Sequence, residues 1–229
     1  MVEITFVKLT DDVPFNSELI KHTSFERRVR ISKLRNEADK KRSLIAELLI
    51  RKAAYEKLMI PIDKVKISYN PYGKPYIANA RKFKFNVSHS GSYVVIAVSE
   101  YGVGIDIEKI REIDMGIAQR FFTKNEYSFI ESLASEVDKR NVFYMYWTLK
   151  ESYIKAIGKG LNIPLNSFEF AIGNNISLNH QRSKGKYCFT STTLNGYAVS
   201  LSSKSYDLKY KYIYTDEADI YNYYKSIVN

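Results

Sequence analysis

Two groups of charged residues in this sequence have the types and spacing to do chemistry. Asp106 and Glu108 lie two apart in the apolar segment 103–108, and Glu151 and Lys155 lie four apart further along the chain. Alternate side chains of a strand point to the same face, so Asp106 and Glu108 would share one face. Two carboxylates held side by side repel each other unless a cation lies between them. The spacing therefore predicts a pair that binds a cation.

Glu151 could complete this pair as a set of three carboxylates. Such a set suits Mg²⁺, a hard cation that takes oxygen ligands and shares its coordination shell with waters and substrate phosphates. The sequence has no His or Cys cluster with the spacing of a zinc site. Simpler interpretations are also open. Glu151 and Lys155 could form an i,i+4 surface ion pair, and Asp106 and Glu108 could lie at an exposed strand end paired to Lys109 or Arg111.

A short polar segment around His89 could bind phosphate. His89 lies between Ser88 and Ser90, and Gly91 follows. A Ser-His hydrolase is a poor match, because sequence neighbours rarely have triad geometry and the chain has no G-x-S-x-G elbow. The chain also lacks a P-loop and a G-x-G-x-x-G motif. A phosphate-binding loop and an ordinary turn histidine are both open.

The element that must position the second charged group is a long helix. Apolar residues at spacings of three and four predict it over about 140–158, ending at Gly158, where glycine suits a C-terminal cap. Trp147 should anchor its packing, one turn before Glu151 and two turns before Lys155.

The first charged group should lie on a strand. β-branched residues and alternation predict strands at 83–87, 93–98 and 103–108, joined by short loops, the first of them at 88–91. Three successive strands with tight connections indicate an antiparallel meander.

The rest of the chain completes two similar halves. Further helices are expected at about 24–34, 36–58, 124–133 and 215–227, and further strands at 4–9, 168–170, 187–190, 196–202 and 209–214. Residues 135–139 read as a polar link. We therefore predict an α+β fold made of a pseudo-two-fold pair of lobes, each a long helix packed on a small antiparallel sheet. The N-terminal lobe should span 1–102 and the C-terminal lobe 103–229, with a ligand cleft between them.

Composition limits the class of protein. The chain has 229 residues, 45% hydrophobic and 26% charged, which is typical of a globular protein. Its apolar runs are too short to cross a membrane, and its single cysteine excludes an internal disulfide. We expect a cytoplasmic protein that binds no membrane. The net charge of +10 predicts an anionic partner, which nucleic acid, an anionic cofactor or an acidic protein would all satisfy.

Taken together, the motifs resemble those of the Sfp-type 4′-phosphopantetheinyl transferases. The matching segments are Tyr72-Gly73-Lys74-Pro75, Asn86-Val87-Ser88-His89-Ser90-Gly91, Val103-Gly104-Ile105-Asp106-Ile107-Glu108, Arg120-Phe121-Phe122-Thr123-Lys124-Asn125-Glu126-Tyr127 and Trp147-Thr148-Leu149-Lys150-Glu151-Ser152-Tyr153-Ile154-Lys155. The similarity runs from about the first predicted helix to Gly160 and fades after Pro164. Enzymes of this family use Mg²⁺ to move the 4′-phosphopantetheine arm of coenzyme A onto a serine of an apo acyl or peptidyl carrier protein, and release 3′,5′-ADP. The resemblance implies coenzyme A between two pseudo-symmetric α+β lobes.

The resemblance also implies a role for each matching residue. Asp106, Glu108 and Glu151 would hold Mg²⁺ against the pyrophosphate, and Lys155 would neutralise phosphate charge in the transition state. Glu151, directly or through a metal-bound water, would take the proton of the incoming serine. The remaining coenzyme A contacts would come from Arg27, Arg30, Arg42, Ser43, Gly73, Lys74, Ser88 and His89. Of these, His89 would face the 3′-phosphate, and Gly73 and Lys74 the adenine.

The expected partner is an acidic apo carrier protein of fatty-acid, polyketide or nonribosomal peptide synthesis, which the positive charge would steer. Its docking surface is predicted on 110–133, where an exposed Met115 or Phe129 could meet an apolar spot. With both lobes in one chain, we expect a monomer that binds no nucleic acid. A basic nucleic-acid-binding protein without catalysis, and a different Mg²⁺-dependent phosphotransferase or nuclease, are the alternatives.

Overall fold

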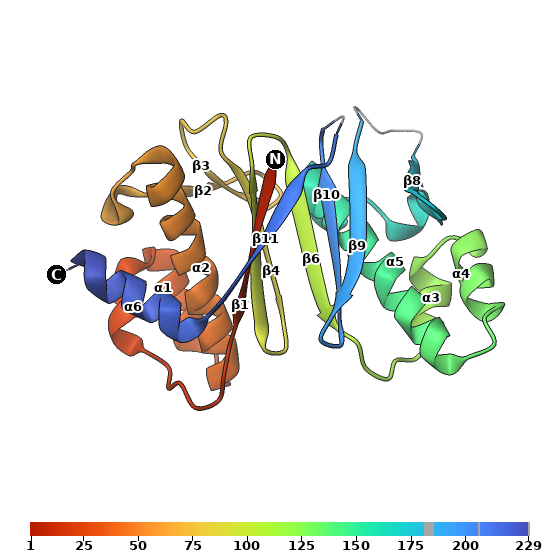
Figure 1. Ribbon diagram of the computed structural model, residues 1–229, viewed down its shortest axis with the longest axis horizontal. Helices are drawn as coiled ribbons and strands as arrows, with labels where there is room; N and C mark the ends of the chain where they lie inside the picture. The colour runs from red at the N-terminus through yellow and green to blue at the C-terminus, as the bar shows by residue number, and fades with distance from the viewer. Residues whose placement is uncertain (181–185, 206, 229) are drawn as a thin grey trace. The chain divides into compact units, whose positions relative to one another are not determined.

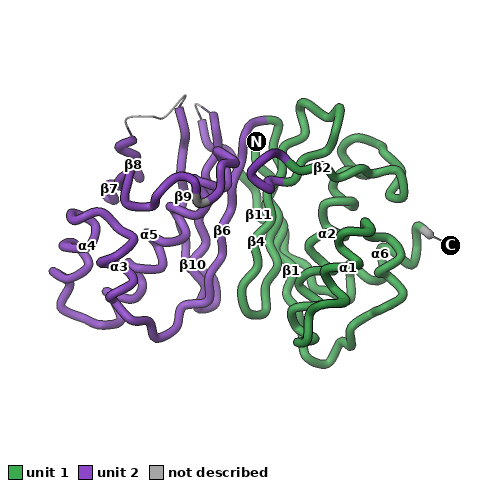
Figure 2. The backbone as a smooth tube through the Cα atoms, turned by 180° about the vertical axis from the view of Figure 1, so that it is seen from behind, with its two compact units in different colours: residues 1–69, 75–100, 210–229 green, residues 70–74, 101–209 purple. Residues whose placement is uncertain are grey.

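The computed structural model describes residues 1–180, 186–205 and 207–228, and divides the chain into two compact units (Figures 1 and 2). Unit 1 comprises residues 1–69, 75–100 and 210–229, and unit 2 comprises 70–74 and 101–209. Each unit combines a helix of 22 residues with a small sheet, so the α+β class is confirmed. No helix in the described ranges is long and apolar enough to cross a membrane.

Unit 1 is built on a four-stranded sheet in the order β11-β1-β5-β4, in which β1 and β11 run parallel and the other neighbours antiparallel. Its long helix α2 packs on β5 and β4. The elements of unit 1 are β1 (Val2–Lys8), α1 (Phe25–Lys33), α2 (Glu37–Leu58), the hairpin strands β2 (Ile67–Tyr69) and β3 (Pro75–Ile77), β4 (Lys84–Ser90), β5 (Tyr93–Ser99), β11 (Tyr210–Asp216) and α6 (Glu217–Val228), with 3-10 turns at Ser17–His22 and Ile62–Lys64.

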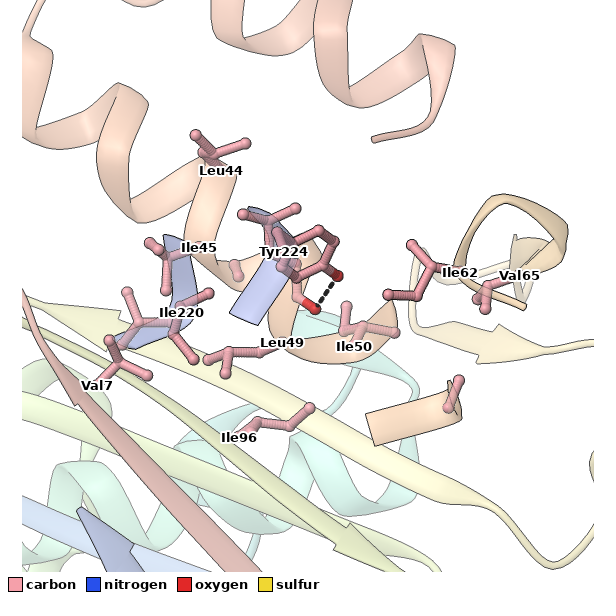
Figure 3. Close-up of a cluster of buried hydrophobic side chains, with 14 of the residues drawn as sticks. Val7, Leu44, Ile45, Leu49, Ile50, Ile62, Val65, Ile96, Ile220 and Tyr224 are labelled. Atoms are coloured by element: carbon pink, nitrogen blue, oxygen red, sulfur yellow. Dashed lines mark hydrogen bonds between the residues drawn. The ribbon is translucent and has the colours of Figure 1, made fainter. Parts of the chain in front are cut away.

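The last helix, α6, closes the core of unit 1 (Figure 3). Ile220 and Tyr224 of α6 are buried with the apolar side chains of α2. The hydroxyl of Tyr224 donates a 2.7 Å hydrogen bond to the backbone oxygen of Leu48. At the start of α6, the buried carboxylate of Glu217 pairs with Lys41 of α2 at 3.3 Å. Because burying either charge alone is costly, this pair ties the end of the chain to α2.

Unit 2 is built on a three-stranded antiparallel sheet in the order β6-β10-β9. The long helix α5 packs along β6 and β10, and Ser135 caps its first turn through the backbone nitrogens of Val137 and Asp138. The elements of unit 2 are β6 (Val103–Lys109), α3 (Gly116–Phe121), α4 (Lys124–Glu131), α5 (Glu136–Ile157), the hairpin strands β7 (Glu169–Ile172) and β8 (Ile176–Asn179), β9 (Cys188–Leu194) and β10 (Tyr197–Ser203), with 3-10 turns at Gly160–Asn162 and Leu165–Ser167.

The structure corrects several expected elements. The predicted meander was wrong in its third strand, because β6 pairs with β10 in unit 2 while β4 and β5 pair in unit 1. Residues 88–90 belong to β4 rather than to a loop, and 136–139 form the first turn of α5 rather than a link.

The expected division at 102 and 103 differs from the two units in two segments. Residues 210–229, expected in the second lobe, belong to unit 1, and the loop 70–74, expected in the first, belongs to unit 2. The sheet of unit 1 is also mixed, because β11 joins it parallel to β1. The cleft expected between the lobes stays a prediction.

Candidate functional site

The two strand carboxylates face α5. Gly104, Asp106 and Glu108 alternate along β6 and therefore share one face, and Gly104 is in direct contact with α5. Asp106 is only 2% exposed, and Glu108 is half-buried nearer the strand end. The sequence prediction that these two carboxylates share a face thus matches the placement of the strand.

A glycine on β6 allows the helix to lie close to this face. A Cβ on Gly104 would come within 2.0 Å of the backbone oxygen of Ser152 and 2.4 Å of the backbone nitrogen of Ala156. Contacts that short are impossible, so a side chain at Gly104 would push α5 away from the carboxylates. Hydroxyl pairs join the same helix to β10: Thr148 with Ser200 at 2.7 Å, and Ser152 with Ser202 at 2.8 Å.

Lys155 reaches across from α5 to the first carboxylate. Its Nζ lies 2.5 Å from Oδ1 of Asp106, and 28% of its side chain is exposed while Asp106 is nearly covered. Lys155 therefore pairs with a residue of β6, and not only with Glu151 along its own helix. The ammonium is held at the strand carboxylate, with one side open to solvent.

Glu151 lies one turn earlier on the same helix, in an environment that favours its neutral form. Burial raises the pKa of Glu151 to about 7, helped by the charges of Asp106 and Glu108 and opposed by Lys155. A carboxyl that titrates near neutral pH can accept a proton and release it again. The raised pKa also shows that the three carboxylates influence one another.

The three carboxylates fit a divalent cation by donor chemistry and charge. All are hard oxygen donors of the kind that Mg²⁺ takes, and their mutual repulsion is what such a cation would relieve. Across residues 1–180, 186–205 and 207–228, however, no three acidic, His or Cys side chains are already arranged to hold a metal ion. The ammonium of Lys155 supplies the positive charge at Asp106 in this arrangement.

The loop containing Gly73 and Lys74 packs on the end of α5. Gly73 has a φ of +83°, which glycine adopts without strain, and it brings the chain around to Lys74. The Nζ of Lys74 donates to three backbone oxygens, those of Val103 at 3.0 Å, Lys155 at 2.6 Å and Ala156 at 3.1 Å. The ammonium group of Lys74 is thus hydrogen-bonded to backbone oxygens of unit 2.

Arg27 and Ser43, both predicted to contact coenzyme A, belong to a buried network in unit 1. The guanidinium of Arg27 lies 3.2 Å from the carboxylate of Glu47 and donates to the hydroxyl of Ser43 at 3.2 Å. Glu47 is fully buried and also pairs with Arg51 at 2.8 Å. These contacts hold α1 against α2.

The remaining predicted phosphate contacts of unit 1 lie on α1, α2 and β4. Arg30 is exposed on α1. Arg42 donates to the backbone oxygen of Gly91 and to Asp39, both at 2.6 Å. On β4, Ser88 is buried and His89 is exposed.

Of the two apolar residues expected to be exposed on the predicted docking surface, only Phe129 is exposed. Phe129 on α4 is 43% exposed, but Met115, just before α3, is half-buried against the core of unit 2. Phe129 is therefore the better anchor of the two.

Sequence reasoning missed a buried ion pair within the matching motifs. Lys150 and Glu126 are both at most 1% exposed and lie 2.8 Å apart. Nζ of Lys150 also donates to the backbone oxygens of Leu165 and Phe168, and Glu126 closes the capping box of α4 with Thr123. A signal existed, because the neighbours of Lys150 three and four positions away are Tyr146, Trp147, Tyr153 and Ile154.

Comparisons with protein families match residues 14–202 of the chain. A family model described as the 4′-phosphopantetheinyl transferase superfamily matches residues 102–202. A second, described as 4′-phosphopantetheinyl transferase, N-terminal, matches residues 14–101. The first match contains all of the site residues on β6 and α5.

Individual relatives give the same result. The 4′-phosphopantetheinyl transferase gsp of Aneurinibacillus migulanus is 44% identical over 171 residues, which is 73% of this chain and 70% of the relative. The 4′-phosphopantetheinyl transferase Sfp of Bacillus subtilis is 38% identical over 154 residues, 67% of this chain and 68% of the relative. Among solved structures, the holo-[acyl-carrier-protein] synthase of Thermotoga maritima aligns with 45% of this chain and 62% of its own, at 24% identity and a TM-score of 0.40.

Proposed function

The chain belongs to the Sfp-type 4′-phosphopantetheinyl transferase family, and from this membership we propose that it moves the 4′-phosphopantetheine arm of coenzyme A onto a serine of an apo acyl or peptidyl carrier protein, with Mg²⁺. One observation carries the proposal. The contact of α5 with β6 brings Lys155 to 2.5 Å from Asp106, beside a Glu151 carboxyl whose pKa is raised to about 7. An acid–base group and a cation next to the buried carboxylate of Asp106 suit the transfer of an anionic phosphoryl group.

In the proposed reaction, the serine oxygen attacks the phosphorus atom that carries the pantetheine arm. A new bond forms between that oxygen and the phosphorus, and the bond from the phosphorus to the bridging pyrophosphate oxygen breaks. The products are the phosphopantetheinyl-serine and 3′,5′-ADP. The serine proton passes to the carboxylate of Glu151, directly or through a bound water.

Asp106, Glu108 and Glu151 are the residues that would hold Mg²⁺. Bound there, the ion would offset the negative charge of the pyrophosphate. Lys155 is exposed enough to contact a phosphate oxygen from its position at Asp106, and would stabilise charge that develops as the bond breaks. The nearly covered Asp106 keeps that ammonium in place.

In unit 1, the exposed side chains Arg30 and His89 and the half-buried Arg42 are the proposed contacts of the coenzyme A phosphates. Ser88, which precedes His89 on β4, is proposed as a further contact. We leave Arg27 and Ser43 out of this set, because Arg27 is already paired with the buried Glu47. The net charge of +10 suits both the phosphates and an acidic carrier protein, for which Phe129 is the proposed anchor.

The proposal is tested by intact-mass analysis of carrier proteins. The purified chain is incubated with coenzyme A, Mg²⁺ and a panel of apo carriers from fatty-acid, polyketide and peptide synthesis. We expect at least one carrier to gain one phosphopantetheine, and its Ser→Ala variant to gain none. If the folded chain leaves every carrier unchanged, the proposed function is wrong.

A binding measurement separates this function from other phosphotransferases that use the same carboxylates. Coenzyme A should raise the melting temperature of the chain, since a ligand that binds only the folded state stabilises it. ATP at the same concentration should not. An equal response to ATP would favour a different phosphotransferase.

A further inference from the structure

The ammonium of Lys74 bridges the end of α5 and the start of β6. It donates to the backbone oxygens of Lys155 and Ala156 at 2.6 and 3.1 Å, in the last turn of the helix. It also donates to the backbone oxygen of Val103 at 3.0 Å, the first residue of the strand. All four residues belong to unit 2. One side chain thus connects the two elements that carry the site.

This contact stabilises the end of the helix in two ways. The last carbonyl groups of an α-helix have no partner within the helix, and a cation there is favoured by the helix dipole. A lysine ammonium has three hydrogen-bond donors, and here three carbonyl oxygens accept from it. The donor capacity of Lys74 is therefore used within the protein.

The loop is built to hold Lys74 in this place. The side-chain oxygen of Asn70 accepts from the backbone nitrogens of Tyr72 and Lys74 at 2.9 and 2.8 Å. Its side-chain nitrogen donates to the backbone oxygen of Gly158 at 2.7 Å. Gly158 has a φ of +77°, and a Cβ there would lie 2.7 Å from Cδ of Lys74. The aliphatic part of the Lys74 side chain is therefore packed tightly against Gly158, with no room for a larger residue there.

We propose that Lys74 is a positioning residue whose side chain fixes the last turn of α5 on β6, and so holds the ammonium of Lys155 at Asp106. The backbone of Lys155 is one of the three groups that Lys74 binds, and Asp106 lies three residues after Val103. Without Lys74, the backbone oxygens of Lys155 and Ala156 would lose their shared side-chain link to Val103 at the start of the strand. This inference rests on the proposed function only for its kinetic consequence.

The experiment compares Lys74→Met with Lys159→Met. Both variants remove one positive charge near the same helix end, but Lys159 is exposed and its side chain has no part in the contact described above. For Lys74→Met we expect kcat for transfer to fall about 10- to 100-fold, because a small displacement of a reacting group is costly. The KM for coenzyme A should stay within about twofold, since ground-state binding is unaffected. Lys159→Met should behave like the wild type.

A rise in the KM for coenzyme A that exceeds the fall in kcat would overturn the inference, because it is the signature of a lost substrate contact. Unchanged kinetics would overturn it as well. Should Lys74→Met fail to fold, Asn70→Ala removes the support of the same loop and should lower kcat in the same direction, again with little change in KM. An Asn70→Ala variant with wild-type kcat would then contradict the proposal.

Hydrogen exchange of the free protein gives a readout that needs no activity. Backbone amides of residues 155–160 should exchange faster in Lys74→Met than in the wild type or in Lys159→Met, because the last turn of α5 has lost its bridge. If the wild type transfers no phosphopantetheine while this exchange result holds, the proposed function fails and the positioning role stands. If transfer is normal and exchange is unchanged, only the positioning role fails.

Discussion

At the scale of single residues, the proposed chemistry depends on a glutamate whose environment opposes its charge. Burial, Asp106 and Glu108 together raise the pKa of Glu151 from its ordinary 4.5 to about 7. The folded protein therefore holds the proton of Glu151 more tightly than the unfolded chain does. The resulting stability is fully present below pH 4.5 and is lost as the pH rises through about 7.

This linkage predicts how Glu151→Gln responds to pH. Gln is neutral at every pH, so at pH 8 and in the presence of a chelator the variant should be more stable than the wild type, by on the order of 2 kcal/mol. The difference should shrink toward pH 5. Urea unfolding of both proteins from pH 5 to 8 measures it. A difference that does not change with pH would mean that Glu151 titrates normally.

The residues of this site could be identified from the sequence, but some of the contacts between them could not be predicted. Spacing alone placed Asp106 and Glu108 on one face of a strand and Glu151 and Lys155 one turn apart on a helix. The pairing of Lys155 with Asp106 joins residues 49 positions apart, and no local pattern indicates which of the carboxylates it meets. Whether the carboxylates share a cation is still a prediction.

At the scale of elements, the close approach of α5 to β6 depends on a missing side chain. Gly104→Ala would place a Cβ 2.0 Å from the backbone oxygen of Ser152, so the helix or the strand must shift. We expect the free energy of unfolding to fall by about 3 kcal/mol or more. Gly173→Ala is the matched control, because a Cβ there meets nothing within 4 Å. Denaturant unfolding that gives both variants the same stability would contradict this description of the contact.

The buried pair of Lys150 and Glu126 joins α5 to α4. Lys150→Met would leave the carboxylate of Glu126 buried without its partner charge, which costs about 3–5 kcal/mol in comparable pairs. Adding Glu126→Gln should recover part of this loss, because the second change removes the stranded charge. Lys209→Met, in an exposed pair with Asp207, should leave the unfolding free energy unchanged. Losses at Lys150 and Glu126 that simply add would show that the two side chains do not interact.

Local signals explain which elements the sequence could predict. Ser24 and Thr123 cap the helices α1 and α4, which begin close to the predicted positions, because a cap is a contact between residues near in sequence. The start of α5 was misjudged by four residues, although Ser135 followed by two acidic residues in the first turn is itself a cap signal. Residues 88–90 were read as a loop because they are polar, yet one face of β4 buries such residues, Ser88 among them.

At the scale of the whole molecule, the chain returns to its first unit at the end. The pairing of β11 with β1 joins segments about 210 residues apart, and α6 contacts α2 through residues 176 positions apart. Hydrophobic periodicity identifies such segments but does not say where they dock. The lobe boundary was therefore predicted as a single cut, whereas residues 210–229 belong to the compact unit 1.

Because α6 packs in unit 1, a substitution at Tyr224 should destabilise unit 1 and leave unit 2 unaffected. Tyr224→Ala removes a fully buried ring from the core of unit 1 and should cost about 3–5 kcal/mol, whereas Tyr224→Phe should cost about 1 kcal/mol for the lost hydrogen bond to Leu48. In hydrogen-exchange mass spectrometry, peptides of α2 and β5 should exchange faster in Tyr224→Ala, and peptides of α5 should not. Uniformly faster exchange would show that the two units unfold together.

The central claim is that the charged residues where α5 meets β6 carry out phosphopantetheine transfer. Single-turnover transfer to an apo carrier, followed by intact mass, tests it most directly when wild type, Glu151→Gln and Glu136→Gln are compared. Glu136 is a highly exposed glutamate in the first turn of the same helix, so its variant controls for the loss of one charge. We predict normal transfer by the wild type and Glu136→Gln, and none by a folded Glu151→Gln. Transfer by Glu151→Gln at the wild-type rate would contradict the claim.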